Sequence, residues 1–153
     1  MQPITYKDKM ITKEYIKELK HKGNGDIANL VNNQRDVGTI NFILESLGQL
    51  PVNFDSKFLY ELLDHQHHQV RLNAVKNIGK LNVKTDIAKL SSLYKIETDT
   101  SVRREIISSI GRQRKAVNKP LLFEFLEDED PKIVCQAIRG LLVFEKDEDV
   151  MEH

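Results

Sequence analysis

The sequence predicts an all-α fold built from about four consecutive two-helix units. Apolar residues recur at the i, i+3, i+4 spacing of amphipathic helices through most of the chain. The pattern returns every 31 to 32 residues, opening at Thr39, Val70, Val102 and Ile133. No segment shows the sustained two-residue alternation of a half-buried strand. Self-similarity at this period is typical of helical repeat arrays, in which neighbouring units bury one continuous core.

Three apolar columns define the second helix of each unit and place its core side on one stripe. The columns are Ile43, Ala74, Ile106 and Ala137; Leu44, Val75, Ile107 and Ile138; and Leu47, Ile78, Ile110 and Leu141. Gly48, Gly79 and Gly111 follow the third column. We expect each glycine to end its helix in a left-handed turn, a conformation that glycine adopts without steric cost.

Capping residues mark where both helices of each unit begin. Seven positions after each glycine come Asp55, Asp86 and Asn118, which are expected to be N-caps of the first helices. In the same register, the predicted N-caps of three second helices are Asp36, Asp99 and Asp130, and His67 takes this place in the remaining unit.

We interpret residues 1–153 as a single all-α repeat domain. Its predicted parts are an N-terminal capping helix at 1–23, repeats at 24–49, 50–80, 81–112 and 113–145, and an acidic tail at 146–153. Because solenoids need polar terminal caps and this tail is short, one hypothesis is that the chain is a fragment of a larger protein.

The pattern D…VRxxAxxxIG is clearest at residues 64–81 and resembles HEAT-like repeats, most closely the short type first noted in phycobilin lyases. It recurs at 99–113 and 130–144 and is degenerate at 36–49. The resemblance implies a right-handed α-α superhelix whose second helices line the concave side. It also implies structural roles for the aspartate and arginine of the motif. Arg71 and Arg103 match that arginine, whereas Ile40 and Val134 replace it.

Composition favours a cytoplasmic protein that is not an enzyme. The formal net charge is zero, and one cysteine, Cys135, excludes an internal disulfide and fits a reducing compartment. No apolar run approaches the roughly 20 residues of a membrane span, and no signal peptide is recognisable, so we expect no membrane partner. The motifs GxGxxG, GxxxxGK, GxSxG and HExxH do not occur, so we predict no cofactor and no catalytic residue.

His65, His67 and His68 lie within four positions and raise the question of a metal site. His65 and His67 could share zinc with Asp64 as a third ligand. Structural zinc sites usually take four protein ligands, and no cysteine lies nearby, so an exposed inter-helix turn is favoured and no metal is predicted.

Positions of the second helices outside the core stripe give a polar concave face, which includes Asn73 and Asn77. It becomes basic over residues 100–120, where six basic residues face one acidic residue. The candidate macromolecule-binding residues are Lys76, Lys80, Arg103, Arg104, Arg112, Arg114, Lys115 and Arg139.

The leading hypothesis is a non-catalytic scaffold that binds a protein partner or partner domain through this face. The alternative is a DNA-binding accessory domain of a nucleic-acid-modifying enzyme, such as a DNA methyltransferase, that contacts phosphates through the patch at 103–119. A third hypothesis, suggested by the resemblance alone, is a lyase-type role in bilin attachment.

Overall fold

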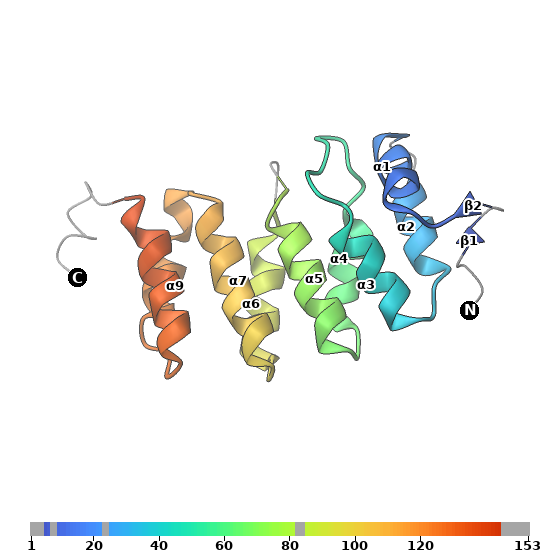
Figure 1. Ribbon diagram of the computed structural model, residues 1–153. Coiled ribbons are helices and arrows are strands. Elements are labelled where there is room, and N and C mark those ends of the chain that lie inside the picture. The colour runs from blue at the N-terminus through green and yellow to red at the C-terminus, as the bar shows by residue number, and fades with distance from the viewer. Residues whose placement is uncertain (1–4, 7–8, 23–24, 82–84, 145–153) are drawn as a thin grey trace. The chain divides into compact units, whose positions relative to one another are not determined.

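The computed structural model is all-helical apart from one very short strand pair, which confirms the all-α class (Figure 1). It describes residues 5–6, 9–22, 25–81 and 85–144. The predicted acidic tail at 146–153 lies outside these residues. The chain divides into two compact units, Met1–Lys84 and Thr85–His153.

The first unit contains the strand pair and five α-helices among its described residues. Its elements are β1 (Thr5–Tyr6), β2 (Lys9–Met10), α1 (Lys13–Lys22), α2 (Asp26–Asn32), α3 (Val37–Glu45), α4 (Lys57–Glu61), the 3₁₀ turn η1 (Leu62–Asp64) and α5 (His68–Ile78). Helix α1 packs on α2, α3 packs on α5, and α4 with η1 covers α5. The antiparallel pairing of β1 with β2 was not predicted, because two residues are too few to show an alternating pattern.

The second unit repeats this plan of alternating helices (Figure 1). Its elements are α6 (Ile87–Ile96), α7 (Thr100–Arg112), the 3₁₀ turn η2 (Ala116–Asn118), α8 (Lys119–Phe125) and α9 (Pro131–Leu142). Helix α9 packs against both α7 and α8, and α6 packs against α7. In each unit, therefore, two predicted second helices lie against each other and are covered by predicted first helices.

The predicted caps of the second helices are confirmed. The carboxylates of Asp36, Asp99 and Asp130 accept backbone N–H groups of the first turns of α3, α7 and α9. His67 does the same for α5, since its Nδ1 accepts from the Gln69 amide at 3.3 Å. Local sequence therefore decides where these helices begin.

Two of the predicted caps of first helices are wrong. Ser56, and not Asp55, directly precedes α4, although the Asp55 carboxylate accepts the Lys57 amide at 3.3 Å. Asn118 is the second. Asn118 precedes α8, but its side chain makes no capping hydrogen bond, and its buried Nδ2 atom has no hydrogen-bond partner among the described residues. The cause is the backbone: η2 runs directly into α8 and holds Asn118 in a right-handed helical conformation. An N-cap side chain reaches the first turn from an extended backbone instead.

The three apolar columns form the core, with one exception. Eleven of their twelve members are at most 5% exposed, whereas Ile138 is 45% exposed. Two of the residues that share its column, Leu44 and Ile107, belong to helices that pack against the next second helix. No helix of the described chain follows α9, so the corresponding side of α9 stays open.

The glycines divide into two roles. Gly48 has the expected left-handed backbone, with φ of 58°. Gly79 is right-handed, and Gly111 lies inside α7, so the prediction for these two is wrong. A Cβ atom on Gly111 would lie 3.1 Å from the Cα atom of Gly140 on α9. Gly111 is thus required for a close approach of two helices and not for a turn.

Replacing Gly140 with alanine is expected to destabilise the protein by about 1–2 kcal/mol, as overpacking does in other cores. The new Cβ would meet the Gly111 Cα atom at 3.1 Å and both Leu122 methyl groups at 3.2 and 3.3 Å. Urea unfolding of the Gly140→Ala variant measures the change.

The control is Gly38→Ala, because a Cβ on exposed Gly38 of α3 would meet one side-chain oxygen of Asp36, at 3.3 Å, and no backbone atom within 4 Å. Alanine normally stabilises a helix relative to glycine by up to about 1 kcal/mol. A Gly140→Ala protein as stable as the parent would show that the close approach imposes no constraint.

Candidate functional site

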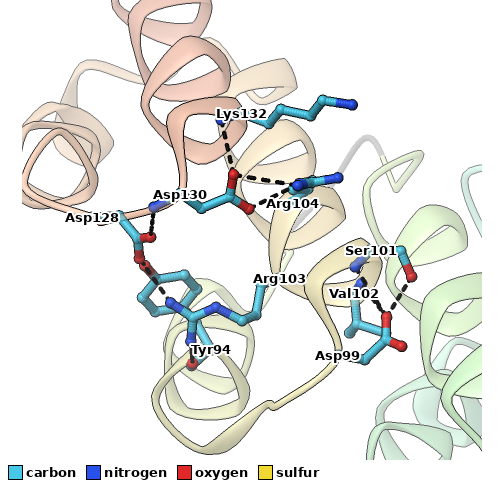
Figure 2. Close-up of polar contacts among 9 residues, drawn as sticks. All are labelled: Tyr94, Asp99, Ser101, Val102, Arg103, Arg104, Asp128, Asp130 and Lys132. Atoms are coloured by element: carbon cyan, nitrogen blue, oxygen red, sulfur yellow. Dashed lines mark hydrogen bonds and ion pairs between the residues drawn. The ribbon is translucent and has the colours of Figure 1, made fainter.

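Arg103, the first arginine of the predicted patch, ties three segments of the second unit together (Figure 2). Its Nη2 atom lies 2.7 Å from Asp128 Oδ2, and its Nη1 atom donates to the carbonyls of Tyr94 at 3.1 Å and Glu97 at 3.4 Å. The guanidinium carbon stands 4.2 Å from the centre of the Tyr94 ring, and the Tyr94 hydroxyl donates to Asp128. The charge of Arg103 is therefore already matched by a largely buried carboxylate.

Arg104 makes a second ion pair one position further along α7 (Figure 2). Its Nε and Nη2 atoms donate to the two carboxylate oxygens of Asp130, at 2.9 and 3.3 Å. Asp130 also accepts the Lys132 amide at 3.0 Å, as the cap of α9. The hydrogen bond from Arg104 lowers the pKa of Asp130. Arg103 and Arg104 thus join α7 to the start of α9, which reduces the cationic surface that the sequence suggested.

An open hollow of about 230 Å³ lies between α7 and α9. Its lining residues are Ser108, Gly111, Arg112, Arg114, Gln136, Arg139, Gly140 and Val143. Three of the eight predicted site residues, Arg112, Arg114 and Arg139, therefore meet at one place. The two glycines of the close approach also line it, so the hollow lies beside the closest contact of the two helices.

The charge around this hollow, which we call the arginine hollow, is positive. Arg112 donates to Glu105 at 3.0 Å, to Ser108 at 3.1 Å and to Ser109 at 3.0 Å, all on its own helix. Arg114 and Arg139 are exposed, and their guanidinium groups make no hydrogen bond or ion pair within the part of the chain that the structure describes. Three arginines thus line the hollow, and a carboxylate pairs with one of them, Arg112, so an anion is the complementary ligand.

The remaining predicted cations are not part of the arginine hollow. Lys115 is exposed and precedes η2. Lys76 is exposed on α5 in the first unit, and the Lys80 ammonium donates to the Gly48 carbonyl at 3.1 Å and to Asn77 Oδ1 at 3.3 Å. Lys80 therefore connects the C-terminal part of α5 to the turn that follows α3.

Asn73 and Asn77 were predicted to lie on an open face but are buried, with 3% and 2% exposure. Asn73 Nδ2 donates to Asn41 Oδ1 at 2.9 Å, and Asn77 Nδ2 donates to the Leu44 carbonyl at 3.1 Å. These amides connect α5 to α3. Apolar periodicity could not reveal this role, because it assigns every polar residue to the surface.

His65 and His67 lie in the turn before α5, as the sequence favoured, and His68 is the first residue of that helix. His65 Nδ1 accepts the His67 amide at 3.0 Å, and the rings of His67 and His68 stack with centroids 5.1 Å apart. Arg71 donates to the carbonyls of His65 at 2.8 Å and Gln66 at 3.0 Å. Burial, together with the neighbouring His67 and Arg71, lowers the pKa of His65. Among the described residues no group of three or more His, Cys, Asp and Glu side chains is arranged to hold a metal ion.

None of the described helices combines the length and the apolar character needed to cross a bilayer. Comparison with protein-family models gives no match, and no curated protein is significantly similar to the chain. The resemblance to HEAT-like repeats therefore stays a prediction from the repeated motif.

The Tyr94 phenol provides a pH test of the Arg103 cluster. Burial, then the hydrogen bond to Asp128, raises its pKa to about 12 from an ordinary value near 10. Since the folded state favours the protonated phenol, its contribution to stability is complete below about pH 10 and is lost as the pH rises through about 12. We expect the Tyr94→Phe variant to lose less unfolding free energy than the parent over this range.

Urea unfolding at a series of alkaline pH values measures this difference, and ultraviolet absorbance follows phenol ionisation. Equal alkaline losses in the parent and in Tyr94→Phe would contradict the assigned role of the phenol.

The stability of the protein at acid pH tests the role of Asp128. Its burial raises the pKa, but the hydrogen bonds from Tyr94 and the Asp130 amide, with Arg103, outweigh burial and lower it overall. The folded state therefore favours the carboxylate, whose contribution is present above about pH 4 and is lost as the pH falls further. We expect Asp128→Asn to flatten the acid limb of the stability curve, measured by urea unfolding between neutral and acid pH. An equal loss of unfolding free energy at acid pH in the parent and in Asp128→Asn would contradict the role assigned to this carboxylate.

Proposed function

We propose that the protein is a non-catalytic, HEAT-like module that binds a partner protein through the face formed by its second helices. The observation that carries this proposal is the arginine hollow, which is built from two such helices, α7 and α9, and is open to solvent. The repeated packing of α3 on α5 and of α7 on α9 supports the proposed right-handed superhelix of four repeats. So do the equivalent capping residues Asp36, His67, Asp99 and Asp130.

The lining of the arginine hollow favours binding over catalysis. Ser108 is the hydroxyl that lines it, and that hydroxyl faces the Arg112 guanidinium at 3.1 Å. Activation of a serine nucleophile needs an adjacent base, and neither histidine nor a carboxylate is among the lining residues. The groups present can hold an anionic or hydrogen-bonding ligand.

A protein is the favoured partner because the free positive charge is local. Duplex DNA is bound through many phosphates, each neutralised by a basic residue. In the patch at 103–119, Arg103 and Arg104 are already paired with Asp128 and Asp130. The DNA-binding alternative keeps Arg112, Arg114, Lys115 and Arg139 as its phosphate contacts.

Site-specific photo-crosslinking distinguishes these two functions. A benzophenone amino acid replaces Gln136 in the arginine hollow or, as the matched control, exposed Ser92 on α6. After irradiation in an extract of the native host, we expect a protease-sensitive adduct from position 136 and little from position 92. A nuclease-sensitive adduct from position 136 would support the DNA alternative. Adducts of equal yield from both positions, or none from 136, would contradict the proposed face.

A further inference from the structure

We propose that the arginine hollow recognises a single phosphoryl group, carried by a phosphorylated serine or threonine of the partner protein. This inference rests on the proposed function and specifies the chemistry of its ligand. Its basis is the convergence of three guanidinium groups, one hydroxyl and one side-chain amide on a recess between α7 and α9.

The donor set matches a phosphate monoester. Arginine presents a planar fork of N–H groups that bonds two phosphate oxygens at once, and clusters of arginine are a recurrent means of binding phosphorylated motifs. Ser108 and Gln136 add neutral donors at the same recess. A phosphoserine carries a charge of about −1.5 to −2 at neutral pH, which complements three arginines of which one, Arg112, is paired with a carboxylate.

Arg112 is held in place before any ligand arrives. Glu105, Ser108 and Ser109 each bond its guanidinium, at 3.0, 3.1 and 3.0 Å. A side chain that is already ordered loses less conformational entropy on binding. The hydrogen bonds of Arg112 thus favour ligand binding, although Glu105 offsets part of its charge.

Arg114 occupies a backbone conformation that is costly for arginine. Its φ of 53° is left-handed, and it directly follows the residue after α7, where its amide donates to the Gly111 carbonyl at 3.2 Å. Glycine is the residue that usually takes this conformation at a helix end, and a non-glycine residue there costs about 1 kcal/mol or more. The chain therefore carries a cation at the edge of the arginine hollow at the expense of stability.

The positions of the helix ends show that the arginines themselves must attract the anion. Arg112 and Arg139 lie in the last turns of α7 and α9. The carbonyl ends of helices carry partial negative charge, which repels an anion and favours cations. The competing explanation is a purely structural role, in which the arginines only offset these helix dipoles. An experiment must distinguish that role from ligand binding.

The extent of the site favours a single phosphoryl group on a protein over a duplex. Arg112, Arg114 and Arg139 line one hollow of about 230 Å³, while the other two arginines of α7 are paired with Asp128 and Asp130. Val143 adds an apolar wall that is 43% exposed. Such a wall suits a side chain adjacent to a phosphorylated residue, whereas phosphate contacts to DNA come from polar and charged groups.

Binding of defined probes to the full chain tests the inference. The probes are inorganic phosphate, a pooled phosphoserine peptide library, the same library without phosphate, and duplex DNA. Inorganic phosphate is expected to shift the amide resonances of Gly111, Gln136 and Gly140. The phosphorylated library should bind at least about tenfold more tightly than its unphosphorylated counterpart, the usual effect of one charge-assisted hydrogen bond.

Two variants distinguish ligand binding from helix stabilisation. Arg139→Gln is expected to weaken binding of the phosphorylated library about tenfold. Arg114→Gly should weaken it too, yet raise the urea midpoint, because glycine relieves the left-handed backbone. Loss of folding cannot produce that combination. The matched control, Arg35→Gln, removes the same charge from an exposed residue of the first unit and should leave affinity unchanged.

Each remaining outcome overturns the inference. One such outcome is equal affinity for the two libraries. Another is a response to inorganic phosphate that persists in Arg139→Gln. A third is lower stability of Arg139→Gln in a protein whose parent form shows no response to phosphate. If a protein adduct still forms at position 136 in these cases, the proposed function stands and only the phosphoryl ligand is wrong. Duplex binding that depends steeply on salt and is lost in both variants would overturn the inference and the proposed function together.

Discussion

The close approach of Gly111 and Gly140 is the constraint on which the second unit depends. Two helix backbones come near enough that a Cβ atom on either glycine would lie 3.1 Å from the other Cα atom. Packing at this distance brings the side chains that flank the two glycines into one place. This contact places Arg112, Gln136 and Arg139 around the same hollow. The geometry of the candidate site therefore depends on the absence of a Cβ atom at both glycines.

Ion pairing determines which cations remain available for a ligand. The sequence carries six basic residues between 100 and 120, and their density suggested a broad basic patch. The tertiary structure uses Arg103 and Arg104 to attach α7 to the segment that leads into α9, through Asp128 and Asp130. The other two arginines of this stretch, Arg112 and Arg114, line the arginine hollow. The sequence suggested an extended basic surface, whereas the structure shows a local site. A ligand with one phosphoryl group is therefore proposed in place of a DNA duplex.

Polar residues in the first unit serve packing in a similar way. Asn73 and Asn77 are buried between α5 and α3. The Asn73 side-chain amide donates to Asn41 Oδ1, and that of Asn77 donates to the backbone carbonyls of Leu44 and Asn73. The large majority of buried polar groups are hydrogen-bonded, and here these bonds constrain how the two helices meet. The His67 ring likewise replaces a capping carboxylate at α5. Residues that resembled a binding face or a metal site are thus part of the framework.

The sequence by itself determined the helices, most of their caps and nearly all of the core. Helix starts at Asp36, Asp99 and Asp130 depend on groups two or three residues away, so local pattern sufficed. The tertiary structure alone decided that Gly111 mediates packing, that Ile138 is exposed, and which arginines are free. Those outcomes depend on contacts between residues some 25 to 33 positions apart, such as Arg103 with Asp128 and Asn77 with Leu44. Helical periodicity records which side of a helix is buried, but not which partner lies against it.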